Sequence, residues 1–238
     1  MVGAIPARFA SKRLPGKVLL QLAGRPMLAH VYERALQADG LDSVVVLTDD
    51  ERVAAAVESF GGKVEMTPAQ CASGTDRIAH AARNWTASAV VNIQGDEPLI
   101  EPAAISRLAR HLAARPDQPM ATLAAPASSD DLANPNVVKV VTDRAGRALY
   151  FSRAAIPHAW DASSPAPALR HIGIYGYQRD TLLHLASLPA TPLERAESLE
   201  QLRALENGIP IQVLEVESAW PGVDTMEDLE AVERLLAP

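Results

Sequence analysis

The first half of the chain alternates short apolar runs with segments of helical periodicity. The runs at residues 43–47 (SVVVL) and 88–93 (SAVVNI) are apolar on both faces, which is typical of buried strands in a parallel sheet. Between such runs, residues 26–37 carry apolar side chains three and four positions apart, which indicates a helix. The pattern predicts strands at 2–5, 43–47, 63–66 and 88–93, and helices at 26–37, 50–60, 73–82 and 102–112.

The second half is richer in strand signals. Short β-type runs follow one another closely, and the turn at residues 143–146 (DRAG) is typical of a hairpin. The apolar spacing at residues 194–206 predicts one amphipathic helix with Leu199, Leu202 and Leu205 facing inward. Strands are expected at 120–126, 137–141, 148–151, 172–177 and 211–216, and a closing helix at 225–236.

This order of elements predicts the fold class. Strands that alternate with helices form parallel βαβ units. We therefore expect an α/β protein with a Rossmann-like, mixed but mostly parallel sheet flanked by helices. Residues 1–238 would form one domain, in which about 120–185 is a β-rich insertion that serves as a lid or an oligomer surface. Ligands of such sheets bind outside the carboxyl ends of the strands, here the loops after residues 5, 47, 94 and 216.

Composition excludes several classes of protein. Of 238 residues, 48% are hydrophobic and 21% are charged, so a sizeable core is expected and bulk disorder is not. A net charge of −7 argues against a nonspecific nucleic-acid binder. No apolar stretch approaches 18 residues, and the first ten residues lack the apolar core of a signal peptide. With Cys71 as the single cysteine, a cytoplasmic protein without membrane insertion is expected.

The charge is distributed unevenly along the chain. Residues 1–32 contain five basic side chains and no acidic one, whereas residues 191–238 contain eleven acidic and three basic side chains. Four of the basic residues lie in the loop that follows the first strand: Arg8, Lys12, Arg13 and Lys17. Such a loop suits a triphosphate, because arginine binds phosphate oxygens bidentately. The alternative is a solvated basic loop without a ligand.

Two aspartates at the ends of predicted strands are candidate metal ligands. Asp96, in the sequence 94–98 (QGDEP), follows a buried strand directly, and its carboxylate could hold Mg²⁺ against phosphate oxygens. Asp224 follows the last strand, so the two carboxylates could share one or two divalent cations. The alternatives are a turn or cap residue at Asp96 and a helix N-cap at Asp224.

Three smaller signals concern ligand binding. The backbone N–H groups at residues 73–77 (SGTDR) could bind a base edge, although a simple helix cap explains the motif equally well. Arg153 could bind an anionic substrate, and so could Arg170 together with His171. Singly, each of these is more often a surface arginine or a hydrogen-bonded core histidine.

Eight motifs give the chain a family resemblance over residues 5–235. In their order along the chain, they resemble CMP-Kdo synthetases (3-deoxy-D-manno-octulosonate cytidylyltransferases; Kdo is the sugar acid). The first motif alone is shared by sugar nucleotidyltransferases in general, whereas the combination of QGDEP, NPN, YFSR and GIYGY is far more specific. The motifs are IPARFASKRLPGK, SGTDR, NIQGDEP, NPNVVKVV, ALYFSRAAIP, HIGIYGYQ, LERAESLEQLRALENG and GVDT.

The resemblance implies that the anomeric 2-hydroxyl of Kdo attacks the α-phosphorus of CTP and releases pyrophosphate, with Mg²⁺ required. It also implies a cytoplasmic homodimer that serves lipopolysaccharide biosynthesis. Arg8, Arg13 and Lys17 would hold the triphosphate, and Pro6, Ala7, Ser73 and Gly74 would lie near the cytosine. Asp96 and Asp224 would bind Mg²⁺, and Arg8, Lys17 and both aspartates form the implied catalytic set. The Kdo site would contain Gln94, Arg153, His171, Tyr175, Glu197 and Gln201.

Other functions compete with this hypothesis. The same chemistry could act on another acidic sugar, such as an amino-substituted octulosonate or a sialic-acid-like sugar. A metal-dependent glycosyltransferase would also use an aspartate at a strand end, but it leaves the basic loop without a triphosphate to hold. A non-catalytic nucleotide-binding module would tolerate the loss of Asp96 and Asp224.

Overall fold

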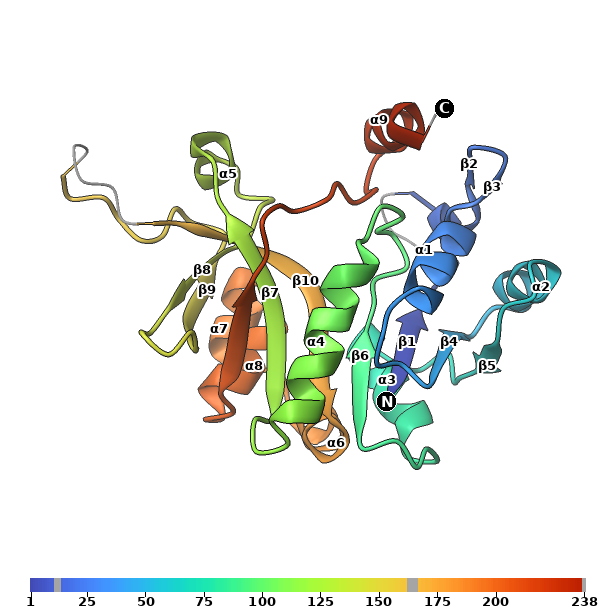
Figure 1. Ribbon diagram of the computed structural model, residues 1–238, viewed down its shortest axis with the longest axis horizontal. Helices are drawn as coiled ribbons and strands as arrows, with labels where there is room; N and C mark the ends of the chain where they lie inside the picture. The colour runs from blue at the N-terminus through green and yellow to red at the C-terminus, as the bar shows by residue number, and fades with distance from the viewer. Residues whose placement is uncertain (11–13, 162–166, 237–238) are drawn as a thin grey trace. The chain divides into compact units, whose positions relative to one another are not determined.

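The structure is a computed structural model that describes residues 1–10, 14–161 and 167–236. The chain divides into two compact units, Met1–Arg110 with Trp220–Pro238, and His111–Ala219 (Figure 1). Helix α4 (Pro102–Ala114) runs from the first unit into the second. None of the helices in the described ranges has the length and apolar composition that a bilayer crossing needs.

The first unit is built around a parallel sheet. In their order across the sheet, its strands are β6 (Ala89–Asn92), β1 (Val2–Pro6), β4 (Ser43–Thr48) and β5 (Val64–Met66). In the central strand, Val2 lies opposite Ser43 of one neighbour and Val90 of the other. All of β6 is buried, as the doubly apolar pattern predicts. The strands and their parallel pairing in this unit are thus confirmed.

The helices of the first unit also follow the sequence pattern. Asp50 caps α2 by accepting a 3.0 Å hydrogen bond from the Arg52 N–H group. A short hairpin and a 3₁₀ turn between β1 and α1 were not predicted, because both are too short to show periodicity. The elements are η1 (Lys17–Leu19), β2 (Gln21–Leu22), β3 (Arg25–Pro26), α1 (Met27–Leu36), α2 (Glu51–Ser59), α3 (Gly74–Ala82) and α9 (Met226–Leu236).

The end of the chain returns to the first unit. Buried Leu229 and Val232 of α9 pack with Leu22 of the hairpin and Met27 of α1. Val223, just before α9, belongs to the same cluster and is 1% exposed. This apolar contact brings the loop that carries Asp224 back to the segment that carries Lys17.

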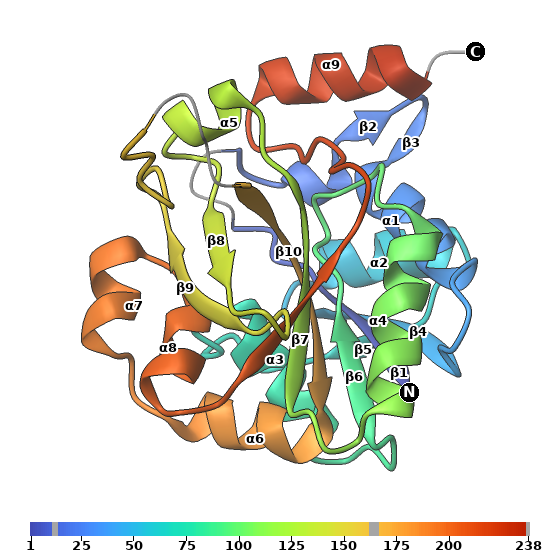
Figure 2. The ribbon, with the colours of Figure 1, turned by 60° about the vertical axis from the view of Figure 1, so that its left-hand side comes forward.

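The second unit contains a mixed sheet around β7 (Met120–Pro126). The strand β7 pairs in parallel with β11 (Ile211–Glu215) and antiparallel with β10 (Leu169–Gln178). The hairpin of β8 (Lys139–Thr142) and β9 (Ala148–Ser152) joins the sheet through β8 and β10 (Figure 2). The predicted turn is confirmed: Gly146 has φ of 76° and donates a 3.0 Å hydrogen bond to the Asp143 carbonyl. Together the two units confirm the α/β class with a mixed sheet.

Two helices of this unit were not predicted. The helix α5 (Ser129–Ala133) is a single capped turn, and its only sequence signal is the capping pair Ser128 and Asp131. The helix α6 (Arg179–Ser187) follows β10 without a break in the chain. The role of residues 120–185 as a lid or oligomer surface stays a prediction.

The prediction of one helix at residues 194–206 is wrong. The structure has two short helices, α7 (Pro192–Glu197) and α8 (Gln201–Glu206), separated at Ser198, which has φ of 52° and ψ of 47°. The left-handed Ser198 ends α7, so that Leu199 (6% exposed) and Leu202 (0%) turn into the core while Leu205 lies only partly buried. Periodicity missed this break because both helices keep leucines at helical spacing.

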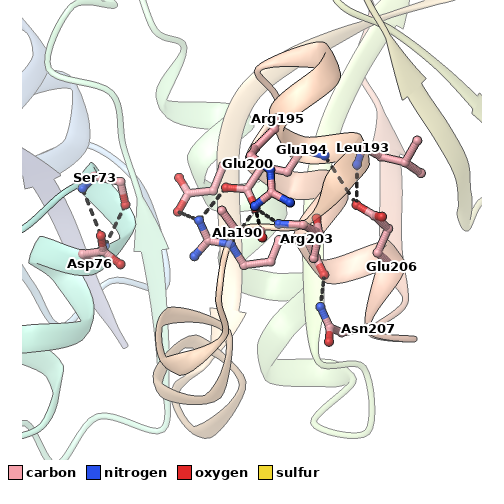
Figure 3. Close-up of polar contacts among 11 residues, drawn as sticks. Ser73, Asp76, Ala190, Leu193, Glu194, Arg195, Glu200, Arg203, Glu206 and Asn207 are labelled. Carbon is pink, nitrogen blue, oxygen red and sulfur yellow. Dashed lines mark hydrogen bonds and ion pairs between the residues drawn. The ribbon is translucent and has the colours of Figure 1, made fainter.

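Carboxylates hold these two helices together (Figure 3). Glu194 accepts hydrogen bonds of 2.9 and 2.5 Å from Nε and Nη2 of Arg203, and both side chains are about nine-tenths buried. Glu194 also caps its own helix by accepting from the Thr191 N–H group. Glu206 accepts from the N–H group of Leu193 at 3.0 Å. The break between α7 and α8 is thus fixed from both sides by charged hydrogen bonds.

Replacing Ser198 with glycine should stabilise the protein by about 1 kcal/mol. A left-handed backbone costs a non-glycine residue about 1–2 kcal/mol, and glycine removes that cost at the expense of some entropy in the unfolded chain. Urea unfolding of the variant against the parent measures the effect. Ser187→Gly, at the right-handed end of α6, is the control and should be destabilising instead. A Ser198→Gly variant that is less stable than the parent would contradict the assignment of strain to this residue.

Candidate functional site

Two carboxylates of the first unit meet at the ammonium group of Lys17. The Nζ atom of Lys17 lies 2.5 Å from Oδ2 of Asp96 and 2.9 Å from Oδ1 of Asp224. It also donates a 3.1 Å hydrogen bond to the Val223 carbonyl. Lys17 and Asp224 are 207 positions apart in the sequence. The fold therefore brings the two candidate metal ligands to a single cationic atom.

Backbone geometry sets this cluster. The N–H group of Val223 donates a 2.9 Å hydrogen bond to the Asp96 carbonyl, so the segment before Asp224 lies against the end of β6. On the other side, Gly16 has φ of 70° and donates to the Phe9 carbonyl at 2.8 Å. A Cβ atom at Gly16 would meet the Phe9 ring at 3.1 Å. Gly16 thus fixes where η1, and with it Lys17, begins.

The electrostatics of the cluster favour the charged form of the lysine. Burial by itself lowers the pKa of Lys17, but the attraction of Asp96 and Asp224 and their hydrogen bonds outweigh it, so the pKa is raised. The Lys17 side chain is 12% exposed, whereas those of Asp96 and Asp224 are 32% and 46% exposed. The carboxylates therefore face solvent while the ammonium group lies beneath them.

The donor set of this cluster fits a magnesium ion. Mg²⁺ prefers oxygen ligands and is commonly held by one or two carboxylates, with phosphate oxygens and water completing its shell. Asp96 and Asp224 supply two such carboxylates. Within the described ranges, no group of three or more His, Cys, Asp or Glu side chains is placed to hold a metal. A site of two carboxylates thus depends on a ligand such as a phosphate for its remaining oxygens.

A cavity of about 230 Å³ lies beside the cluster, at the carboxyl ends of β1 and β6. The loops after residues 5 and 94 line it, as the rule for open α/β sheets predicts. Six residues of the sequence-derived site share this lining: Pro6, Arg8, Lys17, Gly74, Gln94 and Asp96. The structure thus places residues predicted to bind the triphosphate, the base and the metal around one cavity.

The contacts that the structure gives to Ala7 and Arg8 are with other parts of the protein. Ala7 is fully buried, and its N–H group donates to the Leu47 carbonyl at 2.9 Å. Arg8 donates through Nη2 to the Cys71 carbonyl at 2.8 Å. Arg13 lies outside the described residues. Their contacts with a nucleotide stay predictions.

The amino end of α3 approaches β1 closely. Ser73 caps the helix in a reciprocal pair with Asp76, with hydrogen bonds of 3.0 and 3.1 Å (Figure 3). A Cβ atom at Gly74 would meet Cγ of Pro6 at 3.1 Å. Glycine at position 74 is therefore what allows the first turn of α3 to reach the loop after β1. Both alternatives for residues 73–77, a capped helix and a base-binding end, are compatible with this geometry.

A second group of predicted residues is organised around Glu197, in the second unit. Oε1 of Glu197 accepts a 2.6 Å hydrogen bond from the Ser152 hydroxyl, and Oε2 accepts from the Arg153 N–H group at 2.9 Å. Burial raises the pKa of Glu197, but the hydrogen bonds from Arg153, Ser152 and Tyr150 outweigh it and hold the pKa below its ordinary value. The Arg153 guanidinium donates to the carbonyls of Glu197 and Pro135. Arg153 and Glu197 are thus brought together.

Beneath this group lies Lys139, which the sequence analysis did not select. Its side chain is fully buried and donates to the carbonyls of Asn134, Val137 and Arg153 at 3.0, 2.7 and 2.6 Å. Burial, reinforced by the nearby Arg153 charge, lowers its pKa. Lys139 stands inside the quoted motif NPNVVKVV, between apolar neighbours. A charged residue at a buried strand position was the signal that could have identified it.

His171 and Tyr175 share an irregular part of β10. The register of β10 against β7 shifts between Ile172 and Tyr175, and Thr122 faces the shift. The Thr122 hydroxyl lies 2.8 Å from the Ile174 carbonyl and 2.9 Å from Nε2 of His171. Since a hydroxyl has one proton, donation to Ile174 assigns the donor role in the second contact to Nε2 of His171. Nδ1 of His171 is then the acceptor nitrogen.

The neutral state of this ring follows from its surroundings. Desolvation lowers the pKa of His171 to about 3. Its ring contacts Phe151 edge-on, with centroids 5.0 Å apart, and Tyr175 at 5.4 Å. Burial, and to a smaller degree Tyr177 and Glu200, raises the pKa of Tyr175 well above its ordinary value. Both side chains are therefore uncharged hydrogen-bonding groups near pH 7.

This histidine should make the protein sensitive to mild acid. Below pH 6.5 the unfolded chain binds a proton at His171, whereas in the folded chain this histidine stays unprotonated down to about pH 3. As the pH is lowered through that window, this group therefore decreases the free energy of unfolding by about 1.4 kcal/mol per pH unit. Between pH 6.5 and 5 the parent should lose about 2 kcal/mol more than His171→Gln, measured by urea unfolding. The exposed His184→Gln is the control and should behave as the parent; equal losses in all three proteins would contradict the prediction.

The remaining members of the predicted sugar set are placed as follows. Gln94, in the first unit, donates through Nε2 to Oδ1 of buried Asn92 at 3.1 Å. Gln201 begins α8 and is 6% exposed. Contact of this set with a sugar stays a prediction.

Arg77 is a further buried charge that the sequence analysis treated only as part of a motif. It is 1% exposed, pairs with Asp49 at 3.0 Å and hydrogen-bonds to the Thr67 hydroxyl. With Arg8 it lines a smaller cavity of about 190 Å³. Arg77 therefore ties α3 to the loops after β4 and β5.

Comparison with known proteins identifies the chain. Residues 2–215 match the family model described as cytidylyltransferase. The 3-deoxy-manno-octulosonate cytidylyltransferase of Solibacter usitatus is 55% identical over 99% of this chain and 94% of the relative. The chain belongs to the 3-deoxy-manno-octulosonate cytidylyltransferase family. Another member, from Myxococcus xanthus, is 50% identical over 99% of this chain and 96% of the relative.

Comparison with solved structures gives the same assignment for this cytidylyltransferase family member. A CMP:2-keto-3-deoxy-manno-octonic acid synthetase complexed with CTP matches with a TM-score of 0.95 and 47% identity, over 99% of this chain and 97% of that one. A glucose-1-phosphate thymidylyltransferase from Bacillus anthracis shares the fold, with a TM-score of 0.70 at 16% identity. The family resemblance and the nucleotidyltransferase fold expected from the sequence are confirmed.

Proposed function

We propose that this protein transfers CMP from CTP to the anomeric 2-hydroxyl of Kdo, which gives CMP-Kdo and pyrophosphate. Full-length similarity to cytidylyltransferases for this sugar supports the proposal. The observation that carries it is the convergence of Lys17, Asp96 and Asp224 beside a cavity lined by predicted nucleotide residues.

The reaction requires charge neutralisation and alignment more than a covalent nucleophile. The 2-hydroxyl oxygen forms a bond to the α-phosphorus, the bond between the α-phosphorus and the bridging oxygen to the β-phosphate breaks, and the hydroxyl proton is released. Arg8, Arg13 and Lys17 would neutralise the triphosphate. Pro6, Ala7, Ser73 and Gly74 would hold the cytosine through backbone groups. Positioning by such fixed groups supplies much of the rate enhancement in this class of reaction.

Asp96 and Asp224 would hold a magnesium ion. When bound, Mg²⁺ neutralises phosphate charge and lowers the pKa of a coordinated hydroxyl. Chelation with EDTA should therefore stop turnover, and added Mg²⁺ should restore it.

The sugar would be held chiefly by residues of the second unit. Arg153 is proposed to face the Kdo carboxylate, with Glu197, His171, Tyr175 and Gln201 lining the site. A neutral His171 and a protonated Tyr175 suit hydrogen bonding to sugar hydroxyls.

Pyrophosphate release from CTP tests the proposal. Purified protein with Mg²⁺ should release pyrophosphate when Kdo is added and should form CMP-Kdo. Activity with an amino-substituted octulosonate or a sialic-acid-like sugar, but none with Kdo, would show that the other acidic sugar is the substrate. Use of a CMP-sugar instead of CTP would favour the alternative of a metal-dependent glycosyltransferase.

The cellular setting follows from the same proposal. We place the protein in the cytoplasm, in lipopolysaccharide biosynthesis, as a homodimer without nucleic-acid partners. Light scattering of the purified protein tests the dimer, for which a mass of about twice 25.4 kDa is expected.

A further inference from the structure

The segment that precedes Asp224 is fastened to the loop that carries Asp96 at two points. One is the backbone hydrogen bond from Val223 to the Asp96 carbonyl, at 2.9 Å. The other joins side chains: Nε1 of Trp220 donates to Oε2 of Glu97 at 2.8 Å. Glu97 is the direct neighbour of one candidate metal ligand, and Trp220 lies four positions before the other. The pair therefore spans the two segments whose carboxylates meet at Lys17.

Three observations indicate that the contact between Trp220 and Glu97 is a specific structural interaction. Trp220 is 9% exposed, so its indole N–H group is withdrawn from water and needs an acceptor. A carboxylate acceptor makes the hydrogen bond charge-assisted and hence stronger than a neutral one. At Gly222, a Cβ atom would come within 3.7 Å of the Asp96 carbonyl oxygen, which shows how closely the two segments approach.

On its other side, Asp224 is held by the start of α9. Oδ2 of Asp228 accepts hydrogen bonds from the N–H groups of Asp224 and Thr225, at 3.0 and 2.9 Å. The N–H group of Asp228 in turn donates to the Thr225 hydroxyl oxygen at 3.2 Å. The backbone of Asp224 is thus fixed toward α9 by Asp228, and toward the Asp96 loop by Val223 and Trp220.

We propose that Glu97 and Trp220 are positioning residues that hold Asp224 beside Asp96, and that they set the affinity of this carboxylate pair for a divalent cation. The proposal rests on the metal role of the two aspartates in the proposed function. Neither Glu97 nor Trp220 needs to touch the metal. Without their hydrogen bond, the segment before Asp224 loses one of its attachments to the Asp96 loop, and the two carboxylates spend less time at the spacing that one cation requires.

Mn²⁺ binding tests the proposal independently of turnover. Water-proton relaxation reports Mn²⁺ held by the protein, measured with Mn²⁺ alone and with Mn²⁺ plus CTP in the absence of sugar. Trp220→Phe, which removes the indole donor, should weaken Mn²⁺ binding about five- to tenfold, the factor expected for one hydrogen bond. Glu97→Ala should do the same, whereas Glu97→Gln keeps an acceptor oxygen and should stay within about twofold of the parent. The double variant Trp220→Phe/Glu97→Ala should be no weaker than either single variant.

Controls separate positioning from loss of stability. The exposed Glu227→Gln in the first turn of α9 removes a nearby negative charge without touching the contact, and its Mn²⁺ binding should equal that of the parent. With Mg²⁺ in an activity assay, Trp220→Phe and Glu97→Ala should need more metal for half-maximal rate and recover near-parent kcat at saturating metal. Parent-like Mn²⁺ binding in Trp220→Phe and Glu97→Ala, even with a lowered melting temperature, would overturn the proposal. Failure of every protein to use CTP and Kdo would instead refute the proposed function.

Discussion

Replacing Asp96 with asparagine should lower kcat by about a hundred- to a thousandfold while CTP still binds. The amide keeps the size of the side chain but removes one of the two carboxylates that converge at Lys17, and losing charge stabilisation of this kind costs a factor of that order. Lys17 retains its contact with Asp224 in the variant, so the cations of the cavity stay in place for the triphosphate. Pyrophosphate release measures kcat, and calorimetric titration measures CTP affinity.

The outcome distinguishes an enzyme from a nucleotide-binding module. Glu101→Gln, an exposed acid shortly before α4, is the matched control and should keep parent activity. Full activity of Asp96→Asn would remove this residue from the catalytic set and with it the metal role. Loss of CTP binding together with turnover would mean that Asp96 organises the nucleotide site as a whole.

Replacing Lys139 with methionine should lower the free energy of unfolding by about 3–5 kcal/mol. The ammonium group is fully buried and satisfies three backbone carbonyls, from Asn134, Val137 and Arg153. Methionine fills similar space but leaves those acceptors without their charged donor, a change of the kind that costs several kcal/mol. Urea unfolding followed by circular dichroism measures the change.

A matched substitution separates burial from charge. Lys63→Met removes a lysine of the first unit that is exposed, and it should change the free energy of unfolding by less than about 0.5 kcal/mol. Similar small effects in both variants would show that the three carbonyls find water in place of Lys139.

The sequence predicts most of the fold because its strands are short, apolar and separated by helical periods. It also selects Asp96 and Asp224 as candidate metal ligands, and the structure brings them to one cation. Asp224 is not at a strand end, however, since β11 ends at Glu215. It could not show that Ser198 divides a helix, since the leucine spacing continues across the break. Nor could it show what Lys139 and Arg77 contact, because periodicity identifies buried positions but not the hydrogen-bond partners of a charged side chain. The contact of Trp220 with Glu97 joins residues more than a hundred positions apart and leaves no local signal.

The network of α7 and α8 bears on how salt should affect this protein. Within the acidic region at residues 191–238, Glu194 is paired with buried Arg203, and Glu206 accepts from backbone N–H groups. Mobile ions screen exposed charges over about 8 Å at physiological ionic strength, and they act far less on partly buried pairs. The second unit should therefore keep its stability across a wide range of salt. Ionic strength should act mainly on the encounter between the basic loop and its polyanionic ligand, so the two ends of the chain respond differently to the same solvent.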